Sequence, residues 1–319
     1  MKNLITGGAG FIGSHLAEAL LNRGDKVHII DNLSTGSLSN IDRLTKNQNF
    51  SYTIGTIMNE KVVNKLIQDC DCIYHLAAAV GVKLIMEKPL ETIETNVKGT
   101  EMVLRIANKY KKKVLITSTS EIYGNHVQHK LKEDDNRVLG PIKKWRWAYA
   151  SSKTVDEFLA LAYHIEKKLP VVIVRLFNTV GPRQTGAYGM VLPNFVQSAL
   201  LGKPITIYGD GKQTRSFAYV KDVVKAMVEL MGSPKTAGDV FNIGSEEEIS
   251  INDLAKKIKK MVNSSSDIIR ISYKEAYGKG FEDMRRRTPD VSKIKKLIGY
   301  KPSVTLDEII TKVIDYFKR

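Results

Sequence analysis

Cysteine is scarce in this sequence, and long apolar runs are missing from it. Among the 319 residues there are two cysteines, Cys70 and Cys72, and no second pair of Cys or His residues has metal-ligand spacing. No apolar run approaches the ~20 residues of a membrane span. Met1–Asn3 leads straight into a predicted strand and leaves no room for a signal peptide. We therefore expect a cytoplasmic protein with reduced, structural cysteines, no metal ion and no membrane contact.

Acidic residues are in the minority, with 34 Asp and Glu against 49 Lys and Arg, and the net charge is +15. Nucleic-acid binding would explain this excess, but it calls for clustered basic residues among aromatic ones. Three of the four basic runs are better interpreted as solvated helix faces or loops, and Arg285–Arg287 is the exception. We predict no nucleic-acid partner. The four runs are Lys111–Lys113, Lys256–Lys260, Arg285–Arg287 and Lys293–Lys296.

The most informative segment is a strand that runs into three glycines. Leu4–Thr6 is followed by Gly7, Gly10 and Gly13, and then by an amphipathic stretch. Glycines at this spacing let the backbone approach a pyrophosphate, whose charge then faces the amides at the start of a helix. A second strand, Val27–Asp31, ends in an acid that can accept both ribose hydroxyls of an adenosine and would repel a 2′-phosphate. The pattern predicts NAD rather than NADP as the cofactor.

Strand-like and helix-like segments alternate through the first half of the chain, which predicts a doubly wound parallel sheet of the Rossmann type. We expect an NAD-binding domain from residues 1–177 plus 217–243. Residues 178–216 plus 244–319 form the smaller, discontinuous, C-terminal substrate-binding lobe over the carboxyl ends of the strands. The expected strands are Asn3–Thr6, Val27–Asp31, Phe50–Ile54, Cys72–Leu76, Val114–Thr117, Val171–Leu176, Ile205–Tyr208 and Val240–Ile243, and the expected later helices are Met190–Leu201, Phe217–Leu230, Ile251–Val262 and Leu306–Phe317.

Two further segments carry candidate catalytic groups. Thr117–Gly124 places hydroxyls and Glu121 at the end of a strand, and Tyr149–Lys153 opens a long helix. Tyr149 and Lys153 are four residues apart, so both side chains lie on one helix face. A lysine ammonium beside a phenol favours the phenolate, so we expect Lys153 to lower the pKa of Tyr149 and make it a base.

Over its whole length the chain resembles the extended short-chain dehydrogenase/reductases, specifically the group of nucleotide-sugar epimerases, dehydratases and decarboxylases. The resemblance implies a homodimer that holds NAD tightly and oxidises a sugar hydroxyl, usually at C4. The matching segments are Thr6–Leu16, Ile30–Gly36, His75–Ala78, Thr95–Thr100, Ser118–Gly124, Tyr149–Lys153, Arg175–Arg183, Tyr208–Val223, Phe241–Ser245 and Arg287–Pro302.

The resemblance also implies residue roles. Tyr149 would be the base, Lys153 would bind the nicotinamide ribose, Thr119 would shuttle the proton and Glu121 would assist. Thr56 departs from the family, which usually has an acid at this point to contact adenine. The expected cofactor-binding residues are Gly7, Gly10, Phe11, Ile12, Gly13, Asp31, Asn32, Ser34, Thr35, Gly36, Thr56, Ile57, Leu76, Ala77, Ala78, Asn96, Thr117, Tyr149, Lys153 and Phe177. The expected substrate-binding residues are Ser120, Asn178, Val191, Thr206, Tyr208, Arg215 and Arg287.

The product depends on residues near C4 to C6 of the sugar. Ser120 stands where the 4,6-dehydratases look to need an acid, which disfavours dehydration. Glu121 and Arg287 resemble the UDP-glucuronate decarboxylases, and a guanidinium at position 287 could bind a C6 carboxylate. Ala77–Lys83 and Tyr149–Lys153 are instead epimerase-like. Trp145 and Trp147 either line the sugar pocket or anchor their loop.

Our leading hypothesis is therefore an NAD-dependent UDP-sugar 4-epimerase acting on UDP-glucose, UDP-N-acetylglucosamine or UDP-glucuronate. The alternative is a UDP-glucuronate decarboxylase that gives a UDP-pentose. A protein that binds NAD without turnover is a third hypothesis, and the intact set of Thr119, Tyr149 and Lys153 argues against it.

Overall fold

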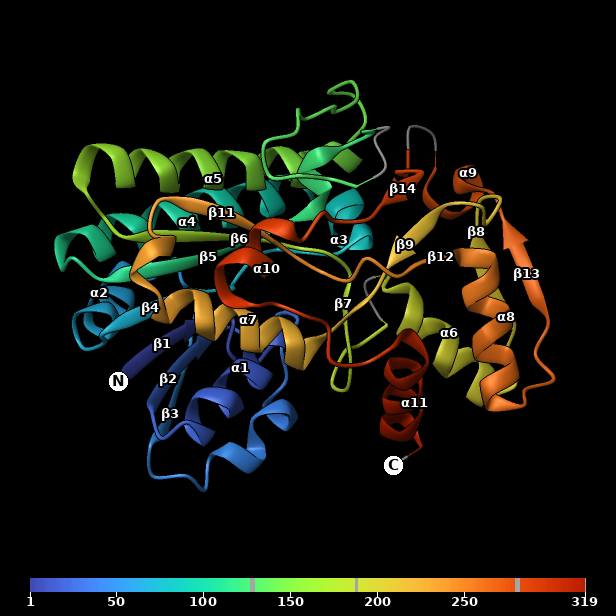
Figure 1. Cartoon of the computed structure of the whole chain (residues 1–319), viewed down its shortest axis with the longest axis horizontal. Helices are drawn as coiled ribbons and strands as arrows, with labels where there is room; N and C mark the ends of the chain where they lie inside the picture. Colours follow the sequence, from blue (N-terminus) through green and yellow to red (C-terminus); the bar gives the residue numbers. More distant parts are fainter. Residues whose placement is uncertain (127–129, 187–188, 279–281, 319) are drawn as a thin grey trace.

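The computed structural model describes residues 1–126, 130–186, 189–278 and 282–318, and within these ranges seven parallel strands form one central sheet. Its strand order is β11-β6-β5-β4-β1-β2-β3 (Figure 1). The strands are β1 (Lys2–Thr6), β2 (Lys26–Asp31), β3 (Phe50–Ile54), β4 (Cys72–His75), β5 (Lys113–Thr119), β6 (Val171–Leu176) and β11 (Asp239–Ile243). The predicted doubly wound Rossmann sheet is confirmed.

Helices cover both faces of the sheet, as its nearly continuous apolar strands require. One face carries α1, α7 and α10, and the other carries α2, α4 and α5 (Figure 1). These helices are α1 (Phe11–Asn22), α2 (Glu60–Gln68), α4 (Pro89–Lys109), α5 (Arg146–Lys167), α7 (Val220–Gly232) and α10 (Ser292–Ile298), and a short α3 (Val82–Glu87) precedes α4. Each face has its own buried apolar cluster.

The remaining elements lie beyond the strands' carboxyl ends. Helices α6, α8 and α11 pack together beside the β8–β13 pair (Figure 1). Helix α11 begins at a capping box made by Thr305 and Glu308. The elements are α6 (Val191–Leu200), α8 (Ile251–Val262), α9 (Tyr273–Tyr277), α11 (Leu306–Phe317), β8 (Ile205–Tyr208), β13 (Ile268–Ile271) and the three strands β12 (Glu248–Ser250), β9 (Thr214–Ser216) and β14 (Arg286–Arg287), which form a sheet of their own.

Two features of this region differ from the sequence prediction. The helix predicted from Phe217 begins at Val220, because Ala218–Tyr219 (β10) is extended and pairs with Thr179–Val180 (β7). The sheet of β12, β9 and β14 was not predicted, since its strands are two or three residues long and have no apolar alternation. Four short 3-10 turns complete the described chain, at Leu38–Asn40, Asp42–Leu44, Ser120–Tyr123 and Pro234–Thr236.

The order of the strands reverses at β1, whose neighbours are β2 and β4. In open α/β sheets, ligands bind outside the carboxyl ends of the strands at such a switch point. Thr6, Asp31, His75 and Thr119 end the four strands β1, β2, β4 and β5. The fold therefore brings the segments with candidate functional residues to one edge of the sheet.

Cys70 and Cys72 are buried and form no disulfide. Burial raises the pKa of each thiol to about 12, so both stay protonated.

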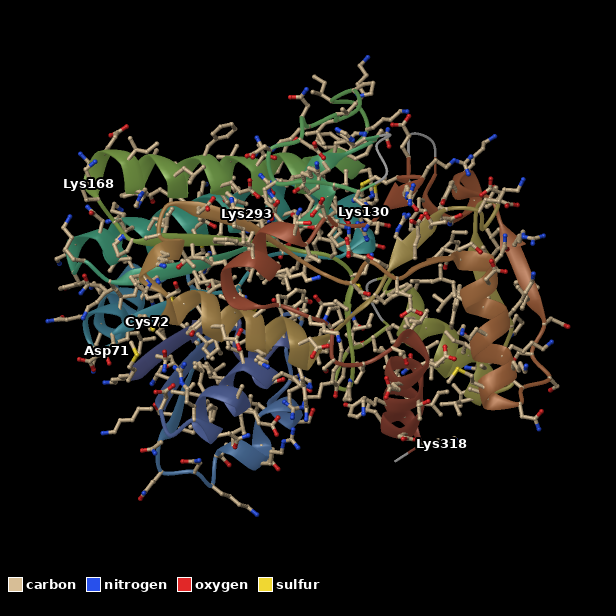
Figure 2. All side chains as sticks on the ribbon, in the orientation of Figure 1. Asp71, Cys72, Lys130, Lys168, Lys293 and Lys318 are labelled. Atoms are coloured by element: carbon tan, nitrogen blue, oxygen red, sulfur yellow. The ribbon has the colours of Figure 1, made fainter. Side chains whose placement is uncertain are left out.

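Figure 2 shows Lys168, Lys293 and Lys318 at well-separated places on the ribbon. Within the described ranges, no helix has both the length and the apolar character needed to cross a membrane.

Candidate functional site

The turn after β1 forms a cradle that a side chain would fill. Gly7 has φ +72°, and a Cβ on it would lie 2.8 Å from the backbone nitrogen of Ala77. Helix α1 begins just beyond, at Phe11, and its N-cap residue Gly10 offers no side chain to the first amides. Those amides are thus available to an anion. The cradle fits the pyrophosphate of a dinucleotide.

Asp31 ends β2 beside this cradle. Its Oδ2 accepts a hydrogen bond from the Ala9 amide (3.0 Å), and its Oδ1 accepts one from the Leu33 amide (2.8 Å). These bonds fix the carboxylate against the glycine turn. Because a carboxylate oxygen has more than one lone pair, Asp31 can still accept ribose hydroxyls.

The other predicted cofactor residues line the same strand ends. Asn96 on α4 accepts from the Ala79 amide (2.8 Å) and donates to Ser152 Oγ (3.1 Å), so it ties the loop after β4 to α5. Thr56 accepts from the Met58 amide within its own turn. Asn32, Ser34, Thr35 and Gly36 follow β2, Ile57 follows β3, Leu76, Ala77 and Ala78 follow β4, Thr117 lies in β5, and Phe177 follows β6.

Thr119 and Tyr149 are in contact, and Lys153 lies on the same helix as Tyr149. Thr119 is the last residue of β5, and a side-chain hydrogen bond joins it to Tyr149 on α5. Tyr149 and Lys153 are buried on the same face of α5. Nζ of Lys153 donates to Oδ2 of Asp156 across 2.7 Å.

In the polypeptide on its own, Lys153 does not bring the pKa of Tyr149 below its ordinary value. Burial raises the pKa of Tyr149, and the negative charges of Glu121 and Asp156 raise it further. The hydrogen bond with Thr119 and the charge of Arg146 act in the opposite direction without overcoming these effects. Asp156 neutralises the charge of Lys153 in an ion pair.

Glu121 is at the centre of a cluster of charged side chains above β5. Its Oε2 accepts a hydrogen bond from Nη1 of Arg146, and its Oε1 accepts one from Nη1 of Arg287 at 3.2 Å. Nη2 of Arg287 also donates to Oδ1 of Asn178. Burial alone would raise the pKa of Glu121, but the two arginines hold it at about 2. Glu121 is therefore a carboxylate at neutral pH.

Arg287 is suited to receiving an anion. Burial and the nearby charge of Arg215 lower its pKa to about 10, while Glu121 opposes them. The guanidinium still carries its charge at neutral pH. Its Nε is buried and has no hydrogen-bond partner among the described residues. A buried cation with an unused donor is costly unless a ligand completes it.

The other residues predicted to bind the substrate lie on several different elements. Arg215 on β9 donates to the Met284 carbonyl and to Asp283 Oδ2, each at 2.8 Å. Tyr208 is 38% exposed and meets the ring of Tyr277 edge-on at 5.3 Å. The remaining positions are Ser120, buried in the turn after β5, Val191, the first residue of α6, and Thr206 in β8.

Neighbouring arginines and tryptophans differ in their surroundings. Arg285 is 76% exposed and pairs with Asp210, and Arg286 pairs with Glu248. Trp147 is buried, which favours its interpretation as an anchor, while Trp145 is half exposed. Of the arginine run, Arg287 alone reaches Glu121 in the described structure.

Sequence reasoning missed the charged residues that support the site. Glu157 on α5 accepts from Ser118 Oγ (2.6 Å) and pairs with Arg175 (2.8 Å) and Arg137 (3.1 Å). Together with Arg146 and Asp156, it lies on the face of α5 that carries Tyr149 and Lys153. The signal was present as polar residues three or four positions apart, at 146, 149, 153, 156 and 157.

Comparison with known proteins assigns the family. The family model described as GDP-mannose 4,6 dehydratase matches residues 4–313. The chain belongs to this family. It is 44% identical over 316 residues to a UDP-N-acetyl-alpha-D-glucosaminuronate decarboxylase of Bacillus cytotoxicus, with 99% of this chain and 97% of that protein covered. It is 38% identical to UDP-glucuronic acid decarboxylase 1 of Xenopus tropicalis, covering 99% of this chain and 72% of that one.

Solved members of the family share its architecture. The structure of Pal from Bacillus thuringiensis matches with a TM-score of 0.91 and 32% identity over 100% of this chain and 99% of that chain. UDP-glucuronic acid 4-epimerase from Bacillus cereus, in complex with UDP-glucuronic acid and NAD, matches with a TM-score of 0.89, 33% identity and the same coverage.

These comparisons overturn the epimerase hypothesis. Identity is 44% to a decarboxylase but 33% to the Bacillus cereus epimerase, so the decarboxylase alternative is the better supported of the two. The coarser prediction, an enzyme that modifies nucleotide sugars, stands. The epimerase-like segments Ala77–Lys83 and Tyr149–Lys153 misled the prediction because both product classes share the first oxidation.

Proposed function

We propose that this chain is an NAD-dependent decarboxylase of a UDP-hexuronate, releasing carbon dioxide and a UDP-pentose. The observation that carries the proposal is the buried Arg287 guanidinium, with its unused Nε, beside the ionised Glu121, whose charge also acts on Tyr149. A C6 carboxylate is the substrate group that such a cation recognises, by paired hydrogen bonds. UDP-glucuronate and UDP-N-acetylglucosaminuronate both carry it.

The cofactor assignment rests on the cradle at Gly7 and on Asp31. Pyrophosphate would lie on the first amides of α1, and the adenosine ribose would lie on Asp31. When bound, NAD supplies the hydride acceptor for C4 of the sugar and returns the hydride at the end of the turnover. The positive charge of the oxidised nicotinamide favours the Tyr149 phenolate, which the polypeptide alone does not.

The residues of the chain then have distinct tasks. Tyr149, hydrogen-bonded to Thr119, takes the proton from O4 as C4 becomes a ketone. The product is a β-keto acid, so the C5–C6 bond can break and leave its electron pair in an enolate on O4, which the Tyr149 hydroxyl protonates or holds. Carbon dioxide leaves and C5 gains a proton from water. C4 then regains the hydride that it gave up, and Tyr149 returns its proton to O4. Glu121 cannot donate protons near pH 7 because its pKa is about 2.

The remaining predictions become part of this proposal. Residues 178–216 and 244–319 would bind the nucleotide and sugar, with Asn178 and Arg215 near the diphosphate. We also infer a homodimer through α4 and α5, because Phe158 (59% exposed), Val155 and Ile165 leave an apolar stripe on α5. Sedimentation of the wild type against Phe158→Arg tests this, since the variant should sediment as a monomer.

The test of the function follows the carboxyl carbon. Purified protein is incubated with UDP-glucuronate or UDP-N-acetylglucosaminuronate, each labelled with ¹³C at C6, and watched by NMR. The expected result is labelled bicarbonate and a UDP-pentose from at least one of them, and the tube that reacts names the substrate. A 4-epimer that keeps its labelled C6, or no reaction in either tube, would overturn the proposal.

A matched pair of variants locates the carboxylate contact. Arg287→Met should abolish product formation, whereas Arg285→Met makes the same charge change two residues earlier on an exposed side chain and should leave it intact. Equal losses in the two variants would count against Arg287 as the group that binds the carboxylate.

A further inference from the structure

Arg146 is a buried cation at the start of α5 that the proposed chemistry has not yet used. Its side chain is 3% exposed, and it lies one turn before Tyr149. Nη1 donates to Oε2 of Glu121, and the charge of Glu121 raises the pKa of Arg146 despite its burial. Arg146 is thus permanently charged and faces the reaction centre rather than solvent.

Glu121 lies between two arginines that come from different parts of the fold. Arg146 on α5 takes one carboxylate oxygen, and Arg287 on β14 takes the other. With both oxygens occupied, the carboxylate cannot rotate without losing a charge-assisted hydrogen bond. The contact between Arg287 and Glu121 spans 3.2 Å, and Nε of Arg287 has no hydrogen-bond partner among the described residues.

The balance of charges around Glu121 indicates what Arg146 does. Glu121 faces Arg146 and Tyr149 from α5 and Arg287 from β14. The charge of Asp283 acts on both of these arginines, and that of Arg215 acts on Arg287. Asp283 is already paired with Arg215. Two cations therefore serve one anion at Glu121, which leaves one positive charge for a second anion. Without Arg146, Arg287 would be the single partner of Glu121 and would have no charge to spare.

We propose that Arg146 is a positioning residue that neutralises Glu121 and so frees Arg287 to bind the carboxylate of the substrate. The identity of that carboxylate as C6 of a UDP-hexuronate rests on the proposed function. The coupling of Arg146 to Arg287 through Glu121 is a property of the polypeptide and is tested by binding alone.

The experiment compares two ligands that differ at C6. UDP-glucuronate and UDP-glucose are each titrated into the NAD-loaded protein by calorimetry under the same conditions. The quantity compared between variants is the ratio of the two affinities. Arg146→Met should lower the affinity for UDP-glucuronate by ~10- to 100-fold, the range expected for losing hydrogen bonds to a charged group, and leave UDP-glucose nearly unchanged. Arg146→Lys keeps the charge and should restore most of the preference.

A double variant shows whether Arg146 acts through Glu121. In Glu121→Gln/Arg146→Met the anion that would occupy Arg287 is gone, so the preference for UDP-glucuronate should return. The double variant leaves no unpaired negative charge buried at position 121. It therefore tests the proposal even where Arg146→Met alone fails to fold.

Three outcomes would overturn the coupling. They are equal losses for the two ligands in Arg146→Met, a double variant without the preference, and an Arg146→Lys variant as weak as the methionine one. A wild type that binds UDP-glucuronate but releases no carbon dioxide would instead overturn the proposed function, and the binding ratios would still decide the role of Arg146.

Discussion

Lys153 and Asp156 form a buried ion pair one and two helical turns after Tyr149, with Nζ and Oδ2 2.7 Å apart. Both side chains are almost completely inaccessible to solvent. Burial raises the pKa of Asp156, although Lys153 opposes this effect. Because Asp156 neutralises Lys153, the surroundings of Tyr149 are less positive than a lysine four residues away would suggest.

Replacing Asp156 should make Tyr149 a better base at low pH. The negative charge of Asp156 raises the pKa of Tyr149, so Asp156→Asn should lower that pKa. In the proposed mechanism Tyr149 works as the phenolate, so activity should rise with pH through its pKa. The rising limb of the pH–rate profile should therefore move to lower pH, by about one unit.

The same substitution should also destabilise the fold. Breaking a buried ion pair leaves Lys153 without its counter-charge, at a cost of about 3 to 5 kcal/mol. A lower midpoint of thermal unfolding together with the shifted pH profile is the expected combination. A limb that stays in place or moves to higher pH would show that Asp156 does not act on Tyr149.

Gly7 and Gly24 provide a matched test of the glycine cradle. Both have positive φ, +72° and +89°, so alanine is strained by about 1 to 2 kcal/mol at either position. A Cβ on Gly7 would also collide with the backbone of Ala77, while one on Gly24 meets nothing within 4 Å. Gly7→Ala should therefore lose NAD affinity by roughly tenfold or more, and Gly24→Ala should keep it. Fluorescence titration with NAD measures both, and equal affinities would place the pyrophosphate elsewhere.

Local patterns predicted most of the sheet because buried parallel strands are short apolar runs. Phe50–Ile54 and Val171–Leu176 were predicted with the bounds that the structure has. The two residues of β14 carry no such pattern, since they are arginines held by pairing with β9. Their position depends on tertiary contacts that a single sequence does not reveal.

The same limit explains what was missed in the site. Tyr149 and Lys153 are four residues apart, so helix geometry alone placed them together. Glu121 and Arg287 are 166 residues apart, and the resemblance to decarboxylases suggested them only as separate residues. Arg146 was detectable as a polar residue on the buried face of α5, but its pairing with Glu121 was not.

Asp31 should set the preference between NAD and NADP. Asp31→Asn removes the charge and keeps one of the two oxygens that accept from the Ala9 and Leu33 amides. Repulsion of a 2′-phosphate is then lost, so the ratio of NADP to NAD affinity should rise by about tenfold or more. The affinities are measured by titration of each cofactor. An unchanged ratio would mean that the ribose does not lie on Asp31.

Glu157 should contribute far more to stability than an exposed acid on the same helix. It is buried and holds Ser118, Arg175 and Arg137, whereas Glu166 on α5 is exposed. Glu157→Gln leaves Arg175 buried without its counter-charge and should lower the free energy of unfolding by about 3 kcal/mol. Glu166→Gln should change it by about 0.5 kcal/mol or less. Urea denaturation of the two variants measures the difference. Equal free energies of unfolding would contradict a structural role for the Glu157 network, and with it the idea that Ser118 and the end of β5 are held in place from α5.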